Sequence, residues 1–252
     1  AEKPSYLFGT IHSDDPRVNR LPPEVQAALD ASDSYVMEVV LDDAAIVELT
    51  NASMLAPEQS LRDFLDAPAY RRTVEAMARY GYPEPAVARL KPWVVLTTLS
   101  TPRSRGGEIL DLVLFTRADS LGKRIHGLET VAEQVAVLDQ IPIDEQIAAL
   151  KDTLDHLDQL ERVFVDLYDA YLSRNLTRLV ELSDEQLHFG DRAAGEALMK
   201  RLIDERNQRM VERLQNRLRE GGAFIAVGAL HLPGEAGLIA LLRAQGLKAE
   251  DA

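Results

Sequence analysis

The sequence contains no cysteine, and this absence excludes several classes of site at once. Without thiols the chain can form no disulfide, no zinc–thiolate centre and no cysteine nucleophile. It also lacks any apolar run approaching the ~20 residues that a membrane-spanning helix requires. Any metal or catalytic site must therefore be built from histidine, carboxylate and other sulfur-free side chains.

Basic residues are scarce relative to acidic ones. The 28 Lys and Arg face 41 Asp and Glu, which gives a formal net charge of −13 at pH 7. Because no basic stripe is available to neutralise phosphates, we expect no nucleic-acid partner. Three catalytic signatures are also missing, namely Gly-x-Ser-x-Gly, His-Glu-x-x-His and a Gly-rich phosphate loop. Serine hydrolases, zincins and nucleotide-dependent enzymes are therefore poor fits.

The remaining composition is that of an ordinary soluble globular protein. Of 252 residues, 46% are hydrophobic and 27% charged, so the chain can bury a sizeable core. The sequence begins at Ala1 rather than Met, and a predicted strand follows within a few residues. This start favours a mature protein trimmed after a signal peptide over a chain shortened artificially, and we expect a periplasmic or otherwise exported protein.

One short sequence motif occurs twice, once near each end of the chain. Residues 6–12 and 224–231 both place an apolar run before Gly-x-x-His, and the two copies end at His12 and His231. If both runs are strands of one sheet, the loops that leave their carboxyl ends carry both imidazoles to one rim. Open α/β sheets usually hold ligands at that rim. We therefore predict that His12 and His231 meet.

Hydrophobic periodicity predicts an α/β fold with a small mixed, mainly parallel sheet. N-terminal and C-terminal β-α-β units build the sheet, and a large central helical insertion caps it. We predict strands at 5–9, 34–40, 123–128, 223–228 and 247–250. Predicted helices are 22–31, 43–55, 68–80, 84–100, 107–120, 130–139 and 235–245, with a helical region at 143–220 broken at Gly190 and Gly195. One domain spans 1–252, with its sheet core at about 1–42, 122–140 and 222–252 and its cap at about 43–121 and 141–221.

Two glutamates follow predicted strands. Glu38 interrupts an apolar strand, so it needs a partner or a metal unless the strand end reaches solvent. If strands 6–9 and 35–40 are adjacent and parallel, Glu38 shares an edge with His12. Glu129 ends the third strand as a ligand, an orienting group or a general base, or else interacts with a helix dipole. Two histidines and one carboxylate with open positions form a recurring divalent-metal arrangement.

Other side chains have both a functional and a structural interpretation. Arg17 and Arg206 could each clamp a substrate carbonyl or carboxylate, although a surface ion pair is the usual role of an arginine in an acidic protein. Trp93 could wall a substrate pocket or simply pack. The remaining histidines are interpreted as structural or surface residues: His126, His156 and His188.

Six motifs in order resemble the TraB/GumN proteins, which are related to the Tiki metalloproteases. They lie at 7–12, 21–23, 36–38, 127–130 with Gln134, 205–207 and 227–234. The wider superfamily includes erythromycin esterases and ChaN-like haem-binding lipoproteins. The resemblance covers nearly the whole chain, and it implies that His12, His231 and Glu38 form the site. It also maps an arginine onto Arg17 and an Arg-Asn pair onto Arg206 and Asn207.

The resemblance leaves three functions open. In the first, a metal-dependent hydrolase cleaves a peptide or related amide, with His12, His231 and Glu38 holding manganese, cobalt or zinc. Glu129 or Glu38 would take the water proton, Arg17 or Arg206 would steady the oxyanion, and Asn207 and Trp93 would contact substrate. In the second, histidine and Glu38 activate water for ester hydrolysis without a metal. The third is a non-catalytic haem-binding or metal-binding protein.

The amphipathic helices at 143–220 have two interpretations. Their apolar positions recur at helical spacing, with charged residues between them. Such helices could pair across a homodimer or cover the sheet of a single chain.

Overall fold

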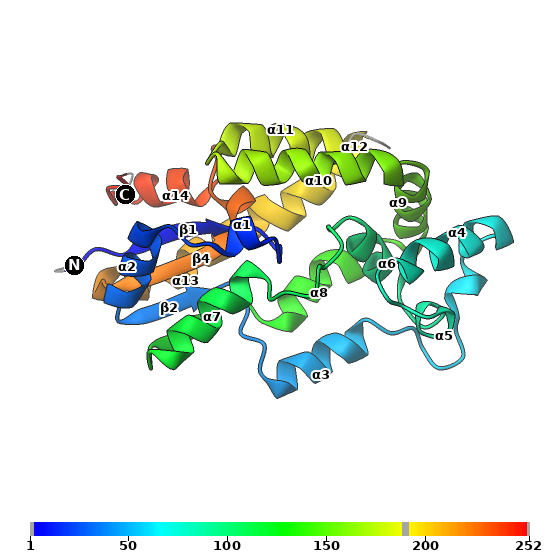
Figure 1. The fold of residues 1–252 in the computed structure, drawn as a ribbon, viewed down its shortest axis with the longest axis horizontal. Coiled ribbons are helices and arrows are strands. Elements are labelled where there is room, and N and C mark those ends of the chain that lie inside the picture. The colour runs from blue at the N-terminus through cyan, green and yellow to red at the C-terminus, as the bar shows by residue number, and fades with distance from the viewer. Residues whose placement is uncertain (1–2, 188–191, 251–252) are drawn as a thin grey trace.

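The computed structural model describes residues 3–187 and 192–250 (Figure 1). Over these ranges, four parallel strands form one sheet in the order β1-β4-β2-β3. Their bounds are β1 Tyr6–Thr10, β2 Ser34–Met37, β3 Arg124–Gly127 and β4 Ala223–Gly228. The prediction of a small, mainly parallel sheet built from both chain ends is confirmed, although the described strands are all parallel and the sheet is not mixed.

The C-terminal strand lies inside the sheet between β1 and β2, so these two strands are parallel but are not adjacent. β4 pairs with β1 from Tyr6–Phe224 to Thr10–Gly228, and with β2 from Ser34–Ala223. Five of the six β4 residues are buried. A strand that is apolar on both faces is most stable where helices cover both sides, which places β4 at the centre.

The predicted strand at 247–250 is also wrong. These residues have no regular structure, and they are exposed. Gly246, at a φ of 84°, ends the preceding helix. The segment buries no side chains, so it has no apolar face to place against the sheet.

Helices cover both faces of the sheet and make three layers. On one face, α2 (Pro23–Ala31) and α7 (Leu110–Ser120) contribute to a core that includes Tyr35 and Phe224. On the other face, α13 (Glu205–Glu220) and α14 (Leu238–Ala244) pack over Ile225 and Val227. The short helix α1 (Pro16–Asn19) follows the β1 loop.

The remaining helices form the cap, which lies beyond the carboxyl ends of the strands (Figure 1). It has its own apolar cluster, which includes Leu61, Met77 and Leu150. Its helices are α3 Asp43–Ala52, α4 Ala67–Ala78, α5 Glu84–Val87, α6 Pro92–Leu99, α8 Val131–Asp139, α9 Ile143–Asp155, α10 Leu157–Leu172, α11 Leu176–Leu187 and α12 Arg192–Met199. Within the described ranges, no helix is long and apolar enough to cross a membrane.

Several predicted helix boundaries differ from the structure. Pro92 begins α6, so the predicted helix 84–100 is two helices. The region 143–220 breaks at His156 and around Arg174, whose φ is 57°. Gly195 lies inside α12 instead of breaking it, and a π-helical turn at Lys200–Asp204 leads into α13. Gly190 and His188 lie outside the described residues.

Candidate functional site

A predicted site residue follows each of the four strands, so all four lie at the edge formed by the carboxyl ends of the strands. His12 follows β1, Glu38 follows β2 directly, Glu129 follows β3, and His231 closes a 3₁₀ turn after β4. Because the strands are parallel, their carboxyl ends point the same way. We call Glu38, Glu129, Arg206, Asn207 and His231, which are linked by contacts there, the rim cluster.

Glu38 is held by two neighbours. Its Oε1 accepts a 2.7 Å hydrogen bond from the backbone N–H of Gly228, and its Oε2 accepts one of 2.6 Å from Arg206 Nη2. A Cβ on Gly228 would lie 3.3 Å from Glu38 Oε1, a tight contact that favours glycine at this position. Burial opposes ionisation of Glu38, but the charges of His231 and Arg206 and the Gly228 N–H outweigh it and lower its pKa.

His231 is 3% exposed, and its tautomer follows from its partner. Asn207 Nδ2 donates to the backbone oxygens of His231 and Ala236, so Asn207 Oδ1 must accept from His231 Nδ1 at 2.7 Å. The unprotonated Nε2 then faces Glu38 Oε1 at 3.8 Å. Burial lowers the pKa of His231 to about 4, so the ring is neutral near pH 7. Near that pH, Arg206, the Gly228 N–H and the charge of His12 therefore remain to lower the pKa of Glu38.

Arg206 joins the two glutamates. Its Nε and Nη2 both donate to Glu129, at 3.0 and 2.7 Å, while Nη2 also reaches Glu38. Gln134 Nε2 donates to both carboxylates at 3.2 Å. Arg209 adds a longer contact of 3.4 Å to Glu129. The surface interpretation of Arg206 therefore does not hold, since its side chain is 10% exposed.

Glu129 does not cap the helix that follows it. Thr130 is the N-cap of α8, and Thr130 and Glu133 form a reciprocal capping box. The Glu129 side chain is fully buried against Arg206 instead.

His12 lies at the same edge but outside the rim cluster. Its ring is 63% exposed, and Nδ1 is 2.9 Å from Asp111 Oδ2. Thr10 Oγ1 donates to the other oxygen of Asp111 at 2.7 Å. The hydrogen bond to Asp111 raises the pKa of His12 to about 9, and the charge of Glu38 also contributes.

Sequence reasoning missed Asp111. It lies 99 positions from His12 on a helix that follows the first part of the cap, and no motif or spacing connects the two. The only local signal is an acidic residue in the first turn of a helix, which is usually a dipole interaction.

Arg17 and Trp93 have other partners. Arg17 pairs with Asp15 at 3.0 Å and with Asp169 at 3.7 Å, and its side chain is 55% exposed. Trp93 is buried in α6, where its Nε1 donates to Asp139 at 2.9 Å. The structure does not bring either residue to the rim cluster.

The donors suit a divalent ion in kind, and two of the three lie together. The neutral Nε2 of His231 faces a carboxylate oxygen of Glu38, while the Nδ1 contact of His12 leaves its Nε2 available. Within residues 3–187 and 192–250, no three His, Asp or Glu side chains form a group that could hold a metal. His12, His231 and Glu38 therefore do not form such a group in this structure.

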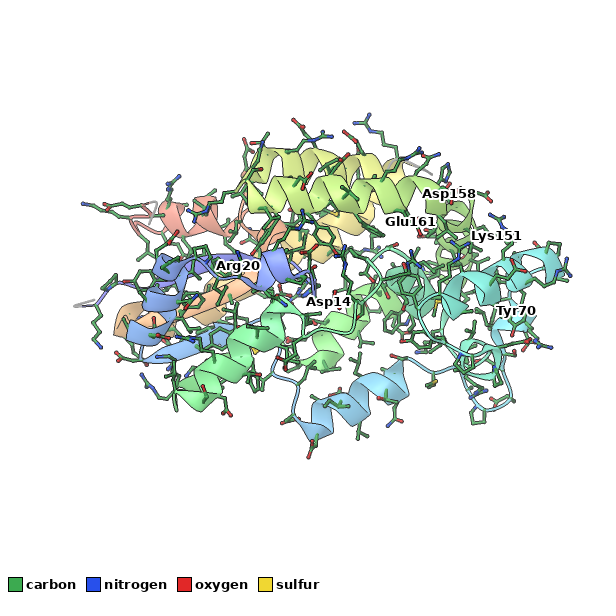
Figure 2. All side chains as sticks on the ribbon, in the orientation of Figure 1. Asp14, Arg20, Tyr70, Lys151, Asp158 and Glu161 are labelled. Carbon is green, nitrogen blue, oxygen red and sulfur yellow. The ribbon has the colours of Figure 1, made fainter. Side chains whose placement is uncertain are left out.

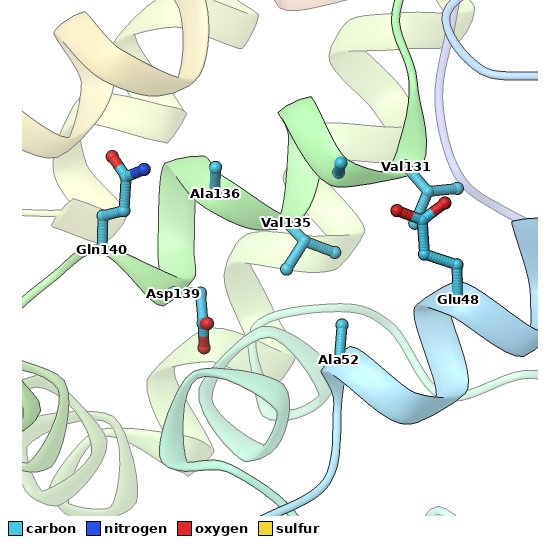
Figure 3. A pocket seen from close by; sticks show the side chains of 8 residues that line it. Glu48, Ala52, Val131, Val135, Ala136, Asp139 and Gln140 are labelled. Atoms are coloured by element: carbon cyan, nitrogen blue, oxygen red, sulfur yellow. The ribbon is translucent and has the colours of Figure 1, made fainter.

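Two cavities lie next to segments that carry the site. One of about 270 Å³ runs between α3 and α8, where Glu48 and Ala52 face Val131 and Val135 (Figure 3). Another of about 470 Å³ lies between α11, α12 and the loop after β4, and Leu230 and Pro233 are among its lining residues. The first begins two residues after Glu129, and the second is lined by residues on either side of His231.

Comparison with known proteins gives consistent relatives. The chain is 28% identical to metalloprotease TIKI2 of Danio rerio, in an alignment that covers 98% of this chain and 58% of that protein. It is 28% identical to metalloprotease TIKI1 of Homo sapiens, over 100% of this chain and 60% of the relative, and 23% identical to the metalloprotease TIKI homolog of Amphimedon queenslandica, over 98% and 59%. The chain thus spans about three fifths of these relatives. No solved structure matches it.

A family model extends the agreement to the full length. The model of the TraB/PrgY/gumN family matches residues 1–251, which includes both Gly-x-x-His copies and every strand of the sheet. The chain therefore belongs to the TraB/PrgY/gumN family.

Proposed function

We propose that the protein is a metal-dependent hydrolase that cleaves a peptide or a related amide. The observation that carries this proposal is the convergence of a neutral His231 and Glu38, 3.8 Å apart, from opposite ends of the chain. The metalloprotease names of the relatives support the same reaction class.

His12, His231 and Glu38 would hold the ion, with manganese or cobalt preferred and zinc as a further candidate. A bound divalent ion lowers the pKa of its water and polarises a substrate carbonyl. Glu38 is the carboxylate that can receive the water proton and return it to the leaving nitrogen, because Glu129 is fully buried in its contact with Arg206. Water oxygen then bonds to the carbonyl carbon as the C–N bond breaks.

The other members of the rim cluster position these groups. Asn207 uses both ends of its amide on the protein and fixes the His231 tautomer, so we assign it to positioning and not to substrate contact. Arg206 and Glu129 hold Glu38 by paired charge-assisted hydrogen bonds. We retain neither Arg17 nor Trp93 in the site.

Elemental analysis of protein purified without chelator tests the proposal. We expect close to one bound divalent ion in the wild type, and peptide cleavage that manganese stimulates. His12→Ala should lose both, while the fold is retained because the ring is 63% exposed. His156→Ala, which changes a histidine at the junction of α9 and α10, is the matched control. Full metal content and activity in His12→Ala would remove the proposal.

A metal-free ester hydrolase is the second candidate, and the His12–Asp111 hydrogen bond favours it. A carboxylate that orients an imidazole is the usual arrangement of a general base and its support, and because the pKa of His12 is raised to about 9, this base would act at alkaline pH. Hydrolysis that survives exhaustive chelation would select this candidate over the first.

Export and homodimer formation also belong to the proposal. Cell fractionation tests the first, and light scattering of the purified chain tests the second. A cytoplasmic, monomeric protein would contradict both.

A further inference from the structure

We propose that Asp111 is a positioning residue that reaches from α7 into the site and holds the His12 ring in its working orientation. This role rests on the proposed function for its consequence, although the contact itself does not. Asp111 lies in the first turn of α7, so it connects the end of a long helical segment to the rim of the sheet.

Both oxygens of Asp111 are used at this edge. Oδ1 accepts from Thr10 Oγ1 at 2.7 Å, and Oδ2 lies 2.9 Å from His12 Nδ1. Thr10 is 1% exposed and is the last residue of β1, so its hydroxyl is a fixed reference point. Because Asp111 occupies Nδ1, the free Nε2 is the nitrogen available for chemistry.

The N-terminal end of α7 is itself fastened to the loop that carries His12. Leu110 N donates to Ser13 O at 3.0 Å, and Gly107 N donates to Asp14 Oδ2 at 3.2 Å. The same Asp14 oxygen accepts from Ser104 Oγ at 2.7 Å. Asp14 is labelled beside this end of α7 in Figure 2. These hydrogen bonds fix the start of α7 relative to the loop that carries His12. The position of Asp111 therefore depends on this loop as well as on its own rotamer.

In both histidines, a side-chain oxygen of another residue contacts Nδ1. His231 gives Nδ1 to Asn207 and keeps Nε2 toward Glu38, while His12 gives Nδ1 to Asp111. Burial restrains the His231 ring, but the exposed His12 ring has no such restraint. Outer partners of ligating histidines fix ring orientation and typically contribute 10–100-fold to metal affinity.

The position of α7 is secured by side chains other than Asp111. α7 is anchored through Leu110, Leu114 and Ala118, which are fully buried in the core between the helix and the sheet. Asp111→Ala should therefore retain the fold. Asp119→Ala, on the exposed end of the same helix, is the matched control.

The experiment has two readouts on the full chain. In metal-free protein, ¹⁵N-histidine NMR should detect the Nδ1 proton of His12 as a downfield, slowly exchanging resonance in wild type and in Asp119→Ala. Asp111→Ala should lose this resonance while circular dichroism stays unchanged. By calorimetry, the dissociation constant for Mn²⁺ should rise about 10–100-fold in Asp111→Ala alone.

The outcomes separate the two proposals. An unchanged His12 Nδ1 proton in Asp111→Ala overturns the role of Asp111, whatever the metal data show. A lost proton with unchanged Mn²⁺ affinity also overturns it, since the ring would then bind without positioning. Mn²⁺ affinity that His12→Ala does not alter rejects the proposed metal function, and the NMR readout still decides the contact. If Asp111→Ala does not fold, Asp111→Leu, which removes the carboxylate but fills its volume, carries the same test.

Discussion

Charge at the rim depends on one buried guanidinium. Arg206 lies between Glu38 and Glu129, and the Glu129 side chain is fully buried. An unpaired carboxylate in such a place is costly, because desolvation of the charge is no longer offset. The two glutamates near His231 are therefore stable as buried carboxylates because Arg206 pairs with both of them.

Arg206→Ala should lower the free energy of unfolding by about 3–5 kcal/mol, because it leaves two carboxylates without their main partner. Urea unfolding followed by circular dichroism measures this loss. The control is Arg178→Ala, whose side chain is 39% exposed in its contacts with Glu181 and Glu185. That change should cost far less, because solvent screens an exposed ion pair. Equal losses in the two variants would contradict a buried charge centre.

The two Gly-x-x-His elements pack against each other. A Cβ on Gly9 would lie 2.9 Å from Leu232 Cδ1 and 3.0 Å from Ala229 Cα, so β1 approaches the turn after β4 too closely for any side chain. Tyr171 of α10 also donates to Gly9 O at 2.8 Å. The first glycine of the repeat therefore serves packing, whereas Gly228 serves the hydrogen bond to Glu38.

Gly9→Ala should destabilise the protein by about 1–3 kcal/mol, as overpacking usually does. Gly127→Ala is the control, because its Cβ would meet its nearest neighbour at 3.4 Å, an ordinary contact. Thermal unfolding of both variants measures the difference. A Gly9 variant as stable as the Gly127 variant would show that β1 and the 229–232 turn can separate without cost.

The start of α8 carries a pH-dependent ion pair. Hydrogen bonds from Arg213 lower the pKa of Glu133 from 4.5 to about 2. A folded-state pKa below the unfolded value means that the stabilisation is complete above pH 4.5 and is lost as the pH falls toward 2.

Glu133→Gln keeps a capping side chain and removes the charge, so it should cost about 0.5–1 kcal/mol at pH 7. The difference from wild type should shrink as the pH falls from about 4.5 to about 3, as measured by urea unfolding at several pH values. Glu145→Gln, an exposed change in α9, is the control. A difference that stays constant over that range would contradict the lowered pKa.

The whole molecule depends on its last strand. β4 pairs with both β1 and β2, so the sheet closes only when residues 223–228 are in place. The cap has a separate apolar cluster but is tied to the sheet through α7 and α10. We therefore expect the cap and sheet to unfold together as one domain.

Trp93 offers a direct test, because it is the only tryptophan and it is buried in cap helix α6. Its fluorescence should report the same urea midpoint as hydrogen exchange of the β4 amides, within experimental error. Guanidinium unfolding should repeat the coincidence. Separate midpoints would instead show that the cap is an independent unit.

Much of the fold is predictable because its signals are local. Apolar runs mark β1, β2 and β4, glycine bounds β3 and β4, and proline and glycine mark most helix ends. Strand order is not local, since β1 and β4 are paired across more than 200 residues. The prediction of a strand at 247–250 was wrong for a related reason, because strand propensity without a buried face does not form a ladder.

The candidate site divides in the same way. The motifs point to His231, Glu38, Glu129 and Arg206, and the structure links these four. Asp111 carries no signal, because its role exists only where α7 meets the β1 loop. Arg17 and Trp93 match site chemistry by residue type, yet their neighbours in space are Asp15 and Asp139.

By itself the sequence determined the chemical inventory, a cysteine-free chain with two Gly-x-x-His elements and strand-end glutamates, because composition and local pattern require no partner. Only the tertiary structure decided that β4 separates β1 from β2, that Arg206 joins the glutamates and that Asp111 reaches His12. Those contacts join segments far apart along the chain, and their free energy comes from burial and charge pairing that exist only once the sheet and cap have packed.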